Sequence, residues 1–598
     1  MQDHPIRIGG ASGFWGDAAL ATGQLLAAGR LDYLVYDYLA EITMSILARA
    51  RRADPCLGYA TDFLTAAMQP NLQAIAAQGV KVIANAGGVN PQGCAEALRA
   101  LIEAQQLPLK VAVVLGDDLF PAVEAFSAGD FREMFSGEPF PPADRIASMN
   151  AYLGAFPIAR ALEAGADIVL TGRCVDSAVS LGACIHAFGW GRENLDYLAQ
   201  GSLAGHLLEC GTQATGGNFT DWEQITASLA DIGYPIAEVM PTGDFVLTKP
   251  AGTGGCVSIG TAAEQMLYEI GDPQAYLLPD VVCDFSQVTM EQQGPDRVLV
   301  RGARGKSAPD TVKVSVTWTD GFRGGEVWTY YGRDAETRAR RFAELVLERS
   351  GRALSARGLP AFRETCVEII GAESHYGAAR TLTRPREVIV KIAARHDSAA
   401  GIGVLFKETV GLALSAPPGL TGFAGGRPKP SPVVRLFSML VPKSALDVRV
   451  EFEGRSIQCS DPPGTPAHSA TREHPEPPQV STHDEVLVVL PLERLAWARS
   501  GDKGDKANIG VIARRPEYLP WIWSVLDEDA VKLRFAHFLR GRVERFLLPG
   551  LPAINFLLHD VLGGGGVASL RNDPQGKGYA QLLLEYPIPL PASLAETL

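Results

Sequence analysis

The amino-acid sequence predicts an α/β fold for the N-terminal region, built on a mainly parallel sheet. Two observations support this: short apolar runs rich in β-branched residues, and helical patterns that alternate with them. Such runs are typical of strands that are buried on both faces of a sheet. The predicted strands are residues 6–8, 33–36, 82–84, 111–115 and 168–170. The predicted helices are residues 17–28, 41–52, 64–77, 92–104 and 145–164. The pattern fits an open doubly wound sheet and a closed barrel equally well.

The pattern changes near residue 280, where we expect a possible boundary within the first domain. A mixed α+β segment follows, in which β-branched and aromatic residues alternate with polar ones. Its predicted strands are residues 297–300, 311–319, 325–331, 387–393 and 433–440, and its predicted helices are residues 333–350 and 401–414. The first predicted domain therefore spans residues 1–455.

The end of the chain is predicted to form a separate small domain. Residues 456–485 are dense in Pro, His, Ser, Thr and Glu and have few large apolar side chains, which is typical of a linker. Residues 486–598 mix strand and helix patterns over a length sufficient for one small α+β domain.

Composition and charge restrict the class of protein. The 598 residues are 46% hydrophobic and 20% charged, with a formal net charge of −13. An acidic chain without long Lys/Arg runs is not expected to bind nucleic acid or an anionic membrane. The sequence shows neither a secretory signal nor an apolar run of membrane-spanning length, so we expect a cytoplasmic protein.

The cysteine and histidine patterns give no sign of a disulfide framework or a metal site. The nine cysteines include no CxxC pair, and the ten histidines show no HxxxH or HExxH spacing. We therefore expect reduced cysteines, no metal and no evident cofactor. Cys174 and Cys210 could act as nucleophiles, but neither has a partner nearby in the sequence.

Polar residues follow the predicted strand ends, which is where α/β proteins bind ligands. The first strand runs into a glycine-rich loop that contains Gly10 and Ser12 and opens a helix at Asp17. Backbone N–H groups at such a helix start could hold an anion or an acyl group, and the alternative is a tight turn without a ligand. The glycine spacing differs from the GxGxxG of dinucleotide-binding folds, although Asp37 lies where a ribose-binding acid would be expected.

Three further strand ends add candidate groups. Glu41 follows the second strand, Asn85 follows the third, and Arg173 and Asp176 follow the fifth. We expect Asp17, Glu41 or Asp176 to act as general acid or base. Arg173 suits bidentate recognition of a carboxylate or phosphate. The alternative for this last loop is an ion pair between Arg173 and Asp176 that only fixes its shape.

Two Thr/Gly loops, at residues 210–222 and 249–256, present hydroxyl and N–H donors with little bulk. This chemistry fits contacts to an oxyanion or a phosphate, and ordinary turns are the alternative. We expect residues 9–13 and 215–217 to lie within one pocket. The candidates in these loops are Thr215, Gly216, Gly217, Asn218, Lys249 and Thr253.

The small domain carries a polar segment at residues 498–508, between two predicted strands. Its cations Arg499, Lys503 and Lys506 could contact phosphate groups, or the segment could dock the domain. Four consecutive glycines at residues 563–566 suggest a close backbone approach to a partner or a ligand.

Several long strings in the sequence resemble a known family. They include IGGASGFWGD (8–17), NAGGVNP (85–91), TGRCVDSA (171–178), HLLECGTQATGGNFTDW (206–222), KPAGTGGCVS (249–258) and ARSGDKGDKANIGVIAR (498–514). These strings look like those of the AtuA family, which is named for acyclic terpene utilisation. The resemblance covers nearly the whole chain. It implies an AtuA-type N-terminal domain and a ferredoxin-like α+β C-terminal domain, and it carries over no catalytic residue. Lys506 departs from the family pattern, in which a small residue is expected.

The resemblance implies a place in the breakdown of citronellol- and geraniol-type terpenes through acyl-CoA intermediates. We therefore expect an enzyme of branched acyl-CoA catabolism with lyase or hydratase chemistry. Its small-molecule substrate would be an acyl-CoA thioester or a terpenoid carboxylic acid, and the chain could form a homo-oligomer. The alternative is a non-catalytic binding or scaffold subunit that assists acyl-CoA-metabolising enzymes.

Overall fold

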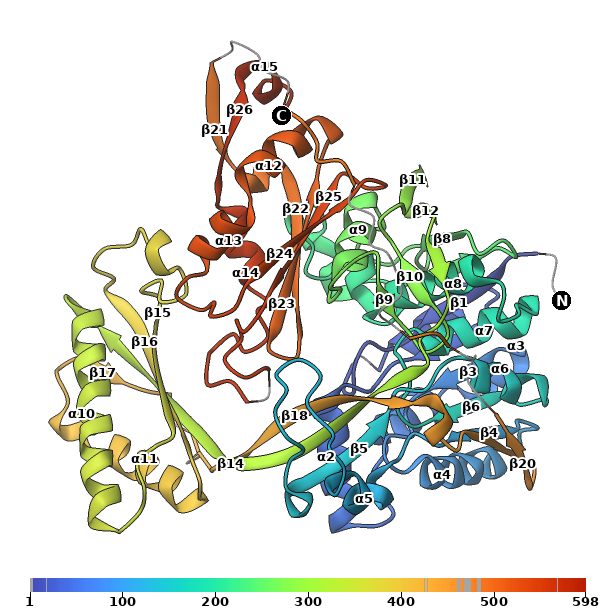
Figure 1. Cartoon of the computed structure of the whole chain (residues 1–598), viewed down its shortest axis with the longest axis horizontal. Coiled ribbons are helices and arrows are strands. Elements are labelled where there is room, and N and C mark those ends of the chain that lie inside the picture. Colours follow the sequence, from blue (N-terminus) through green and yellow to red (C-terminus); the bar gives the residue numbers. More distant parts are fainter. Residues whose placement is uncertain are drawn as a thin grey trace.

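The body of the molecule is an open sheet of eleven strands (Figure 1). The computed structural model describes residues 4–17, 19–423, 425–426, 428–459, 464–466, 475–480, 486–566 and 568–598. Within these residues the strands lie in the order β11-β12-β8-β7-β1-β2-β3-β6-β4-β19-β20. Because the order begins and ends with different strands, the sheet is open and does not close into a barrel.

Five parallel neighbours form the centre of this sheet. Alternate side chains of the second of them enter different cores: Tyr33 and Val35 on one face, Leu34 and Tyr36 on the other. Burial on both faces explains why these strands are apolar throughout, and the five predicted strands are confirmed. They are β1 (Ile6–Gly10), β2 (Tyr33–Tyr36), β3 (Lys81–Ala84), β6 (Ile168–Thr171) and β4 (Val111–Leu115).

The strands added at both flanks pair antiparallel, so the sheet as a whole is mixed and only its centre is parallel. On one flank lie β7 (Ile236–Val239), β8 (Phe245–Thr248), β12 (Arg297–Arg301) and β11 (Thr289–Gly294). On the other lie β19 (Arg449–Phe452) and β20 (Arg455–Gln458). β20 carries the sheet into the first residues of the segment predicted as a linker. Most of that segment, at 460–463, 467–474 and 481–485, lies outside the described residues.

Helices cover both faces of the sheet (Figure 1). One core contains side chains of α1 (Ala21–Ala27), α2 (Glu41–Ala53), α3 (Leu72–Gln78) and α4 (Pro91–Ala104). The other contains side chains of α6 (Phe156–Glu163), α7 (Ala178–Phe188), α8 (Leu195–Leu208) and α9 (Ile259–Leu267). Short elements complete this region: α5 (Val123–Ser127), and a small sheet of β9 (Tyr276–Leu277), β10 (Val282–Asp284) and β13 (Arg304–Lys306).

The prediction of one helix over residues 145–164 is wrong. Its first part is a strand, β5 (Ile146–Ala151), and only its second part is helical, as α6. β5 pairs antiparallel with β14 (Thr311–Tyr331), which lies far away in the sequence. Because this pairing decides the conformation, the local pattern of residues could not reveal it.

β14 is one strand of 21 residues, where the sequence predicts two shorter ones. Its first part pairs with β5 and β18 (Ser431–Pro442) beside the main body. Its second part pairs with β16 (Glu387–His396) and β17 (Leu420–Thr421). There it belongs to a smaller module with β15 (Glu364–Ile370), α10 (Ala335–Ala356) and α11 (Ala399–Gly411). Figure 1 shows β14 running from the body to this module.

The C-terminal domain has an antiparallel sheet in the order β22-β23-β25-β24. Its strands are β22 (Ala496–Lys503), β23 (Lys506–Ala513), β25 (Ala553–Leu558) and β24 (Val543–Leu548). Around it lie α12 (Leu519–Val525), α13 (Glu528–Arg534), α14 (Tyr579–Leu584), α15 (Ala592–Ala595) and the strand pair β21 (Leu487–Pro491) with β26 (Pro587–Pro591). The segment predicted as a long polar loop at 498–508 is instead a hairpin, paired up to Lys503 and Lys506.

This domain packs against the body beside α9, which contacts β22 and β23 (Figure 1). Asn508 on β23 donates to the carbonyl of Leu267 at 2.5 Å. Arg514 donates from both terminal nitrogens to the Asp221 carboxylate, at 2.6 and 2.5 Å. Charge-assisted bidentate pairs and buried amide contacts of this kind favour one orientation of the two domains.

Across the described part of the chain, every helix is too short or too polar to cross a lipid bilayer.

Candidate functional site

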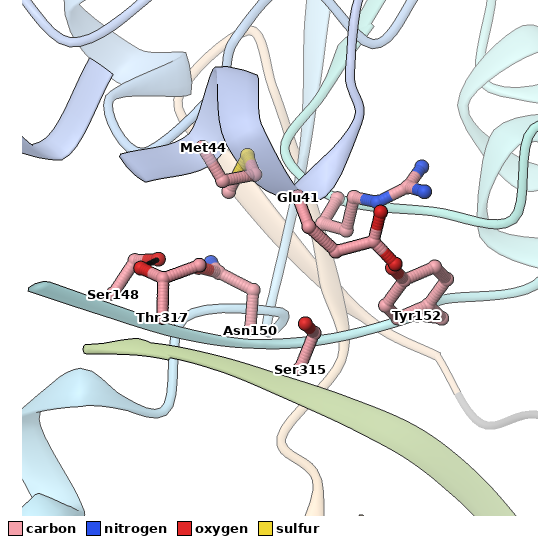
Figure 2. Close-up of a pocket in the computed structure, with 8 residues that line it drawn as sticks. Glu41, Met44, Ser148, Asn150, Tyr152, Ser315 and Thr317 are labelled. Carbon is pink, nitrogen blue, oxygen red and sulfur yellow. Dashed lines mark hydrogen bonds between the residues drawn. The ribbon is translucent and has the colours of Figure 1, made fainter. Parts of the chain in front are cut away.

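The carboxyl ends of the parallel strands open onto a small hollow between α2, β5 and β14 (Figure 2). Figure 2 shows side chains from these three elements pointing toward one another. The hollow leaves about 10 Å³ accessible to the centre of a water molecule, which is room for about one water. Its lining residues are Glu41, Met44, Ser148, Asn150, Tyr152, Arg173, Ser315 and Thr317.

Glu41 is the ionised centre of this site. Its Oε1 accepts hydrogen bonds from the Tyr152 hydroxyl at 2.5 Å and from Lys313 Nζ at 3.1 Å. Burial by itself raises the pKa of Glu41, but the charges of Lys313 and Arg173 more than offset this and hold the pKa well below its usual range. Glu41 is therefore a carboxylate near neutral pH.

Tyr152 carries two cations against its ring. The guanidinium carbon of Arg173 lies 4.1 Å from the ring centroid, and Lys313 Nζ lies 4.7 Å from it. Both distances are within the range of a cation–π interaction. Burial raises the pKa of Tyr152, so its hydroxyl keeps its proton and donates a hydrogen bond to Glu41. The ring thus holds both cations beside the hollow.

Arg173 is 3% exposed and is held by the loop that follows β6. Its NH1 donates to Asp176 Oδ1 at 2.6 Å, and its backbone N–H donates to Asp117 Oδ2 at 2.8 Å. Asn150 donates to the same Asp117 oxygen at 2.9 Å. Burial raises the pKa of Asp117 to about 7. The ion pair with Asp176 fixes the loop, and it also leaves Arg173 lining the hollow.

Asp37 and Asn85 lie at the ends of β2 and β3, next to this cluster. Asn85 Nδ2 donates to Asp37 Oδ1, and Asn85 Oδ1 accepts from the Tyr38 N–H at 2.7 Å. Burial and the nearby Asp176 charge raise the pKa of Asp37 well above its usual range, against the opposing effect of Arg173. The strand ends therefore hold acids whose pKa values are moved in opposite directions.

Lys503 brings a cation to the site from the C-terminal domain. It lies at the tip of the β22–β23 hairpin and keeps an exposed side chain. Desolvation by the surrounding protein lowers the pKa of Lys503, but the acidic groups around it more than offset this and raise the pKa above its usual range. These groups are Tyr276, Glu269, Asp176 and Glu41. Lys503 is charged and exposed to solvent. It interacts electrostatically with Glu41 at the start of α2 and with Asp176 in the loop after β6.

The glycine run at residues 563–566 supports this hairpin tip. A Cβ on Gly565 would lie 2.9 Å from the carbonyl oxygen of Gly504, the residue after Lys503. Leu562 N–H donates to Asp505 Oδ1 at 2.9 Å, in the same turn. The expected close backbone approach is made to the turn that positions Lys503.

His206 and Glu209 form a buried pair near the same acids. His206 Nδ1 lies 2.8 Å from Glu209 Oε1, and Glu209 raises the pKa of His206 against the effect of burial. Burial raises the pKa of Glu209, and Asp176 adds to this rise. The sequence patterns did not single out this pair.

Asp17 and Ser12 lie in a second small hollow, beside Tyr38 and Asp62. Asp17 accepts from the Gly13 N–H at 2.9 Å and from the Tyr234 hydroxyl at 2.6 Å. These contacts hold the loop that contains Asp17 in place. Ser12 Oγ donates to the carbonyl of Asp37, the residue after β2, at 3.2 Å.

Close packing explains Gly10, and backbone conformation explains Gly216. A Cβ on Gly10 would lie 2.9 Å from the Leu208 carbonyl at the end of α8. Gly216 has φ of +110°, which requires glycine, and exposed Asn218 also adopts a positive φ of +57°. Fully buried Thr215 donates to the Gly233 carbonyl at 2.6 Å.

Of the two loops expected in one pocket, residues 9–13 contribute Ser12 to the second hollow. Residues 215–217 line neither of the two hollows.

The other predicted cations have partners elsewhere. Lys249 donates to the Thr253 carbonyl at 2.8 Å and lies 3.2 Å from Asp296. Arg499 is 6% exposed and donates to the Gly217 carbonyl at 3.0 Å, between the domains.

Lys506 lies 3.7 Å from the ring centroid of Phe135. Of these three cations in the C-terminal domain, Lys503 is the one whose pKa is raised by the acids at the strand ends.

The cysteines named in the sequence are buried or partly buried thiols. Burial raises the pKa of Cys174 to about 12 and the pKa of Cys210 well above its usual range, which disfavours the reactive thiolate. In the described residues, no cluster of three or more His, Cys, Asp or Glu side chains is placed to bind a metal ion.

Tyr152, Lys313, Asn150 and Asp117 were missed by the sequence patterns. The first three come from the paired strands β5 and β14 or the residue after β5, and β5 was predicted as a helix. A signal was present for Asp117, which follows the apolar run of β4 in the same way as the other strand-end residues.

The fold and site define a two-domain α/β protein whose polar cluster lies at the ends of parallel strands, with a small α+β domain facing it. The chain belongs to the acyclic terpene utilisation family. Residues 6–452 match the model of the acyclic terpene utilisation family protein AtuA, and residues 490–589 match the AtuA ferredoxin-like domain. Comparisons with curated proteins and with solved structures found no match.

Proposed function

We propose that the protein is an enzyme of acyclic terpene breakdown that acts on a branched acyl-CoA thioester, or on the matching carboxylic acid, by hydratase or lyase chemistry. Its family is named for acyclic terpene utilisation, and this name supports a substrate derived from an acyclic terpene. The reaction class is proposed from the arrangement of charges at the strand ends.

The observation that carries the proposal is the convergence of three cations on Glu41. Arg173, Lys313 and Lys503 come from three distant segments, and all three influence or contact Glu41. Hydration of a C=C bond, and cleavage next to a thioester, both develop negative charge on the carbonyl oxygen. Fixed cations in a partly dry site stabilise such charge, which lowers the barrier.

The pKa values of the acids of the site are shifted in opposite directions, which suits a pair of proton donor and proton acceptor. The pKa of Glu41 is lowered, while the pKa values of Asp37 and Glu209 are raised. A site that moves neighbouring carboxyl groups apart in this way contains both a proton acceptor and a proton donor. We assign Asp37 as the proton donor and Glu41 as the carboxylate that faces the substrate.

Lys503 marks the position of the thioester or carboxylate group, because it is the exposed cation of the cluster. The inner hollow has room for about one water and not for an acyl chain, so the substrate lies on its open side. Arg499 is buried between the domains and is left out of this assignment.

The test is turnover of branched α,β-unsaturated acyl-CoA thioesters by the purified full chain, followed by mass spectrometry for gain or loss of one water or for cleavage. Lys503→Met should lower kcat/KM on the order of 100-fold, because it removes a charge at the developing oxyanion. Lys506→Met, on the same hairpin, is the matched control and should keep the activity.

A wild-type chain that binds these thioesters without turning them over would favour the scaffold alternative. Failure to bind any acyl-CoA or branched acid would contradict the proposed substrate class.

A further inference from the structure

Three residues that line the inner hollow each have a buried polar atom without a hydrogen-bond partner among the described residues. These atoms are Asn150 Oδ1, Ser315 Oγ and Arg173 Nε. These side chains are 2%, 7% and 3% exposed, and they come from β5, β14 and the loop after β6. Buried polar groups without a partner are rare in folded proteins, and several around one hollow indicate a missing polar occupant.

The donor and acceptor pattern specifies the occupant. Arg173 Nε can only donate, Asn150 Oδ1 can only accept, and the Ser315 hydroxyl can do either. A water molecule can satisfy all three, since its oxygen accepts from Arg173 Nε while its two protons go to Asn150 Oδ1 and Ser315 Oγ. An alcohol hydroxyl can do so as well, since its one proton goes to Asn150 and its oxygen accepts from Arg173 and from the Ser315 hydroxyl. A carboxylate has no proton for Asn150, and a methyl group would leave all three atoms unpaired.

Other polar atoms of the residues that line the hollow already have hydrogen-bond partners. Ser148 and Thr317 hydroxyls pair with each other at 2.6 Å, and Asn150 Nδ2 already donates to Asp117. In Figure 2 these side chains lie on the same side of the hollow as Ser315, opposite Glu41 and Met44 on α2. The unpaired atoms thus belong to residues in the wall of one hollow, which has room for about one water.

We propose that this hollow is the binding site of the one oxygen that the reaction adds or releases: a water molecule before hydration, and the hydroxyl group of the product after it. The inference rests on the proposed function and names Asn150 and Ser315 as positioning residues. It also accounts for the position of the hollow next to Glu41 and Tyr152.

In the hydration direction the water oxygen forms a bond to the β-carbon of an α,β-unsaturated thioester. The π electrons of the C=C bond move toward the carbonyl oxygen, and one proton of the water passes to the Glu41 carboxylate. The Asp37 carboxyl then delivers a proton to the α-carbon, and the proton held by Glu41 passes through solvent to restore Asp37, so that the sum is addition of one water. As the enolate charge develops it competes for Lys313 and Arg173, which makes Glu41 a stronger base at that moment.

The decisive variant is Ser315→Val, which removes the hydroxyl and fills the hollow with methyl groups. Thr329→Val is the matched control on the same strand, because Thr329 lies in the part of β14 that pairs with β16 and β17 and does not line the hollow. We expect an ordered water in crystals of the wild type and of Thr329→Val, and no water in Ser315→Val. We expect kcat for hydration to fall on the order of 100-fold in Ser315→Val, with the Kd for a saturated acyl-CoA unchanged.

Ser315→Ala provides a second variant that keeps the space. It should retain a weakly ordered water and show an intermediate kcat. Crystals with a bound 3-hydroxyacyl thioester separate the two sources of the oxygen, since the substrate hydroxyl should then replace the water.

A dry hollow in the wild type, or a Ser315→Val variant with full hydration activity, would overturn this inference alone. A wild-type chain that hydrates and dehydrates no thioester would overturn the proposed function, and with it the reacting role of the water. The two failures are distinguishable because the density is read without turnover.

Discussion

Glu41 lies between a phenol and a cation, and this arrangement decides its charge. Tyr152 and Lys313 both donate to one of its oxygens. The cost of placing a carboxylate beside a half-buried hollow is offset by these donors and by the Arg173 charge. Removing the charge of Glu41 therefore tests the centre of the site directly.

Glu41→Gln should lower kcat on the order of 100-fold or more, because the amide can neither accept a proton nor hold Lys313 as an ion pair. Thermal unfolding should change little, since Lys313 is partly exposed and can be solvated. Steady-state kinetics and circular dichroism melting are the measurements. Glu408→Gln, at the Arg349 ion pair on α11, is the control and should keep full activity. An active Glu41→Gln enzyme would contradict the role given to this residue.

Glu264 gives a pH-dependent contribution to stability. It is 1% exposed and accepts from Thr220, and burial raises its pKa from about 4.5 to about 7. Between these values the unfolded chain has lost the proton and the folded chain retains it, so stability falls as the pH rises from about 4.5 to about 7. The change is about 1.4 kcal/mol for each pH unit.

Glu264→Gln removes this titration and keeps an oxygen for Thr220. Its free energy of unfolding relative to the wild type should rise through that window and stay constant above pH 7. Chemical denaturation at several pH values measures it. A difference between the two proteins that does not vary with pH would show that Glu264 is already ionised in the folded state.

At the scale of elements, the β22–β23 hairpin is the part of the C-terminal domain that reaches the site. Its tip is held by the glycine run, where Gly565 has φ of +87° and touches the backbone of Gly504. A side chain there is strained by its own backbone and also pushes the turn away.

Gly565→Ala should destabilise the folded chain by about 1–2 kcal/mol, because alanine is disfavoured at positive φ. It should also lower kcat/KM, since the turn that holds Lys503 shifts. Activity assays combined with denaturant unfolding separate the two effects. Gly351→Ala, in the middle of α10 with open space around it, is the control and should be neutral or stabilising without any change in activity. Unchanged activity in Gly565→Ala would show that the tip tolerates displacement.

The elements also show how far sequence patterns reach. The five parallel strands were predictable because each is a continuous apolar run, buried on both faces. β5 was not, because its six buried residues contain Ser148 and Asn150 and its conformation depends on pairing with β14. The strand-end residues Glu41 and Arg173, which line the hollow, were therefore among the candidates that the sequence suggested. Those that depend on the β5–β14 pair were not.

Glycine-rich loops were the least informative signal. Gly10 and Gly216 look alike in the sequence as potential oxyanion loops. In the structure one permits close packing against α8 and the other supplies a positive φ. Composition identifies a position that needs glycine, but it does not distinguish a ligand from a neighbouring backbone.

At the scale of the whole molecule, the site requires both domains in one orientation. Arg514 and Trp497 on the C-terminal domain both donate to Asp221 on the body. Arg514 also lies 5.2 Å from the centroid of the Trp497 ring. These contacts are remote from the hollow, and they connect to it only by fixing where Lys503 lies.

Arg514→Met should lower kcat/KM on the order of tenfold without unfolding either domain, since a small shift of a positioned charge weakens its effect on the transition state. Arg515→Met is the control, because Arg515 pairs within its own domain with Glu517. Small-angle scattering of the full chain should show a larger radius of gyration for Arg514→Met alone. Equal activity in both variants would mean that the remaining interface contacts suffice to orient the domains.

The length of β14 has a consequence for which insertions and deletions the fold can accept. Side chains alternate between the two faces of a strand, so the loss of one residue from it would turn every later side chain to the opposite face. Residues of the inner hollow sit near its start, and the packing surface for α10 and α11 sits near its end. Natural insertions and deletions should therefore occur in the turns beyond the end of β14. There they leave the alternation of side chains along the strand unchanged.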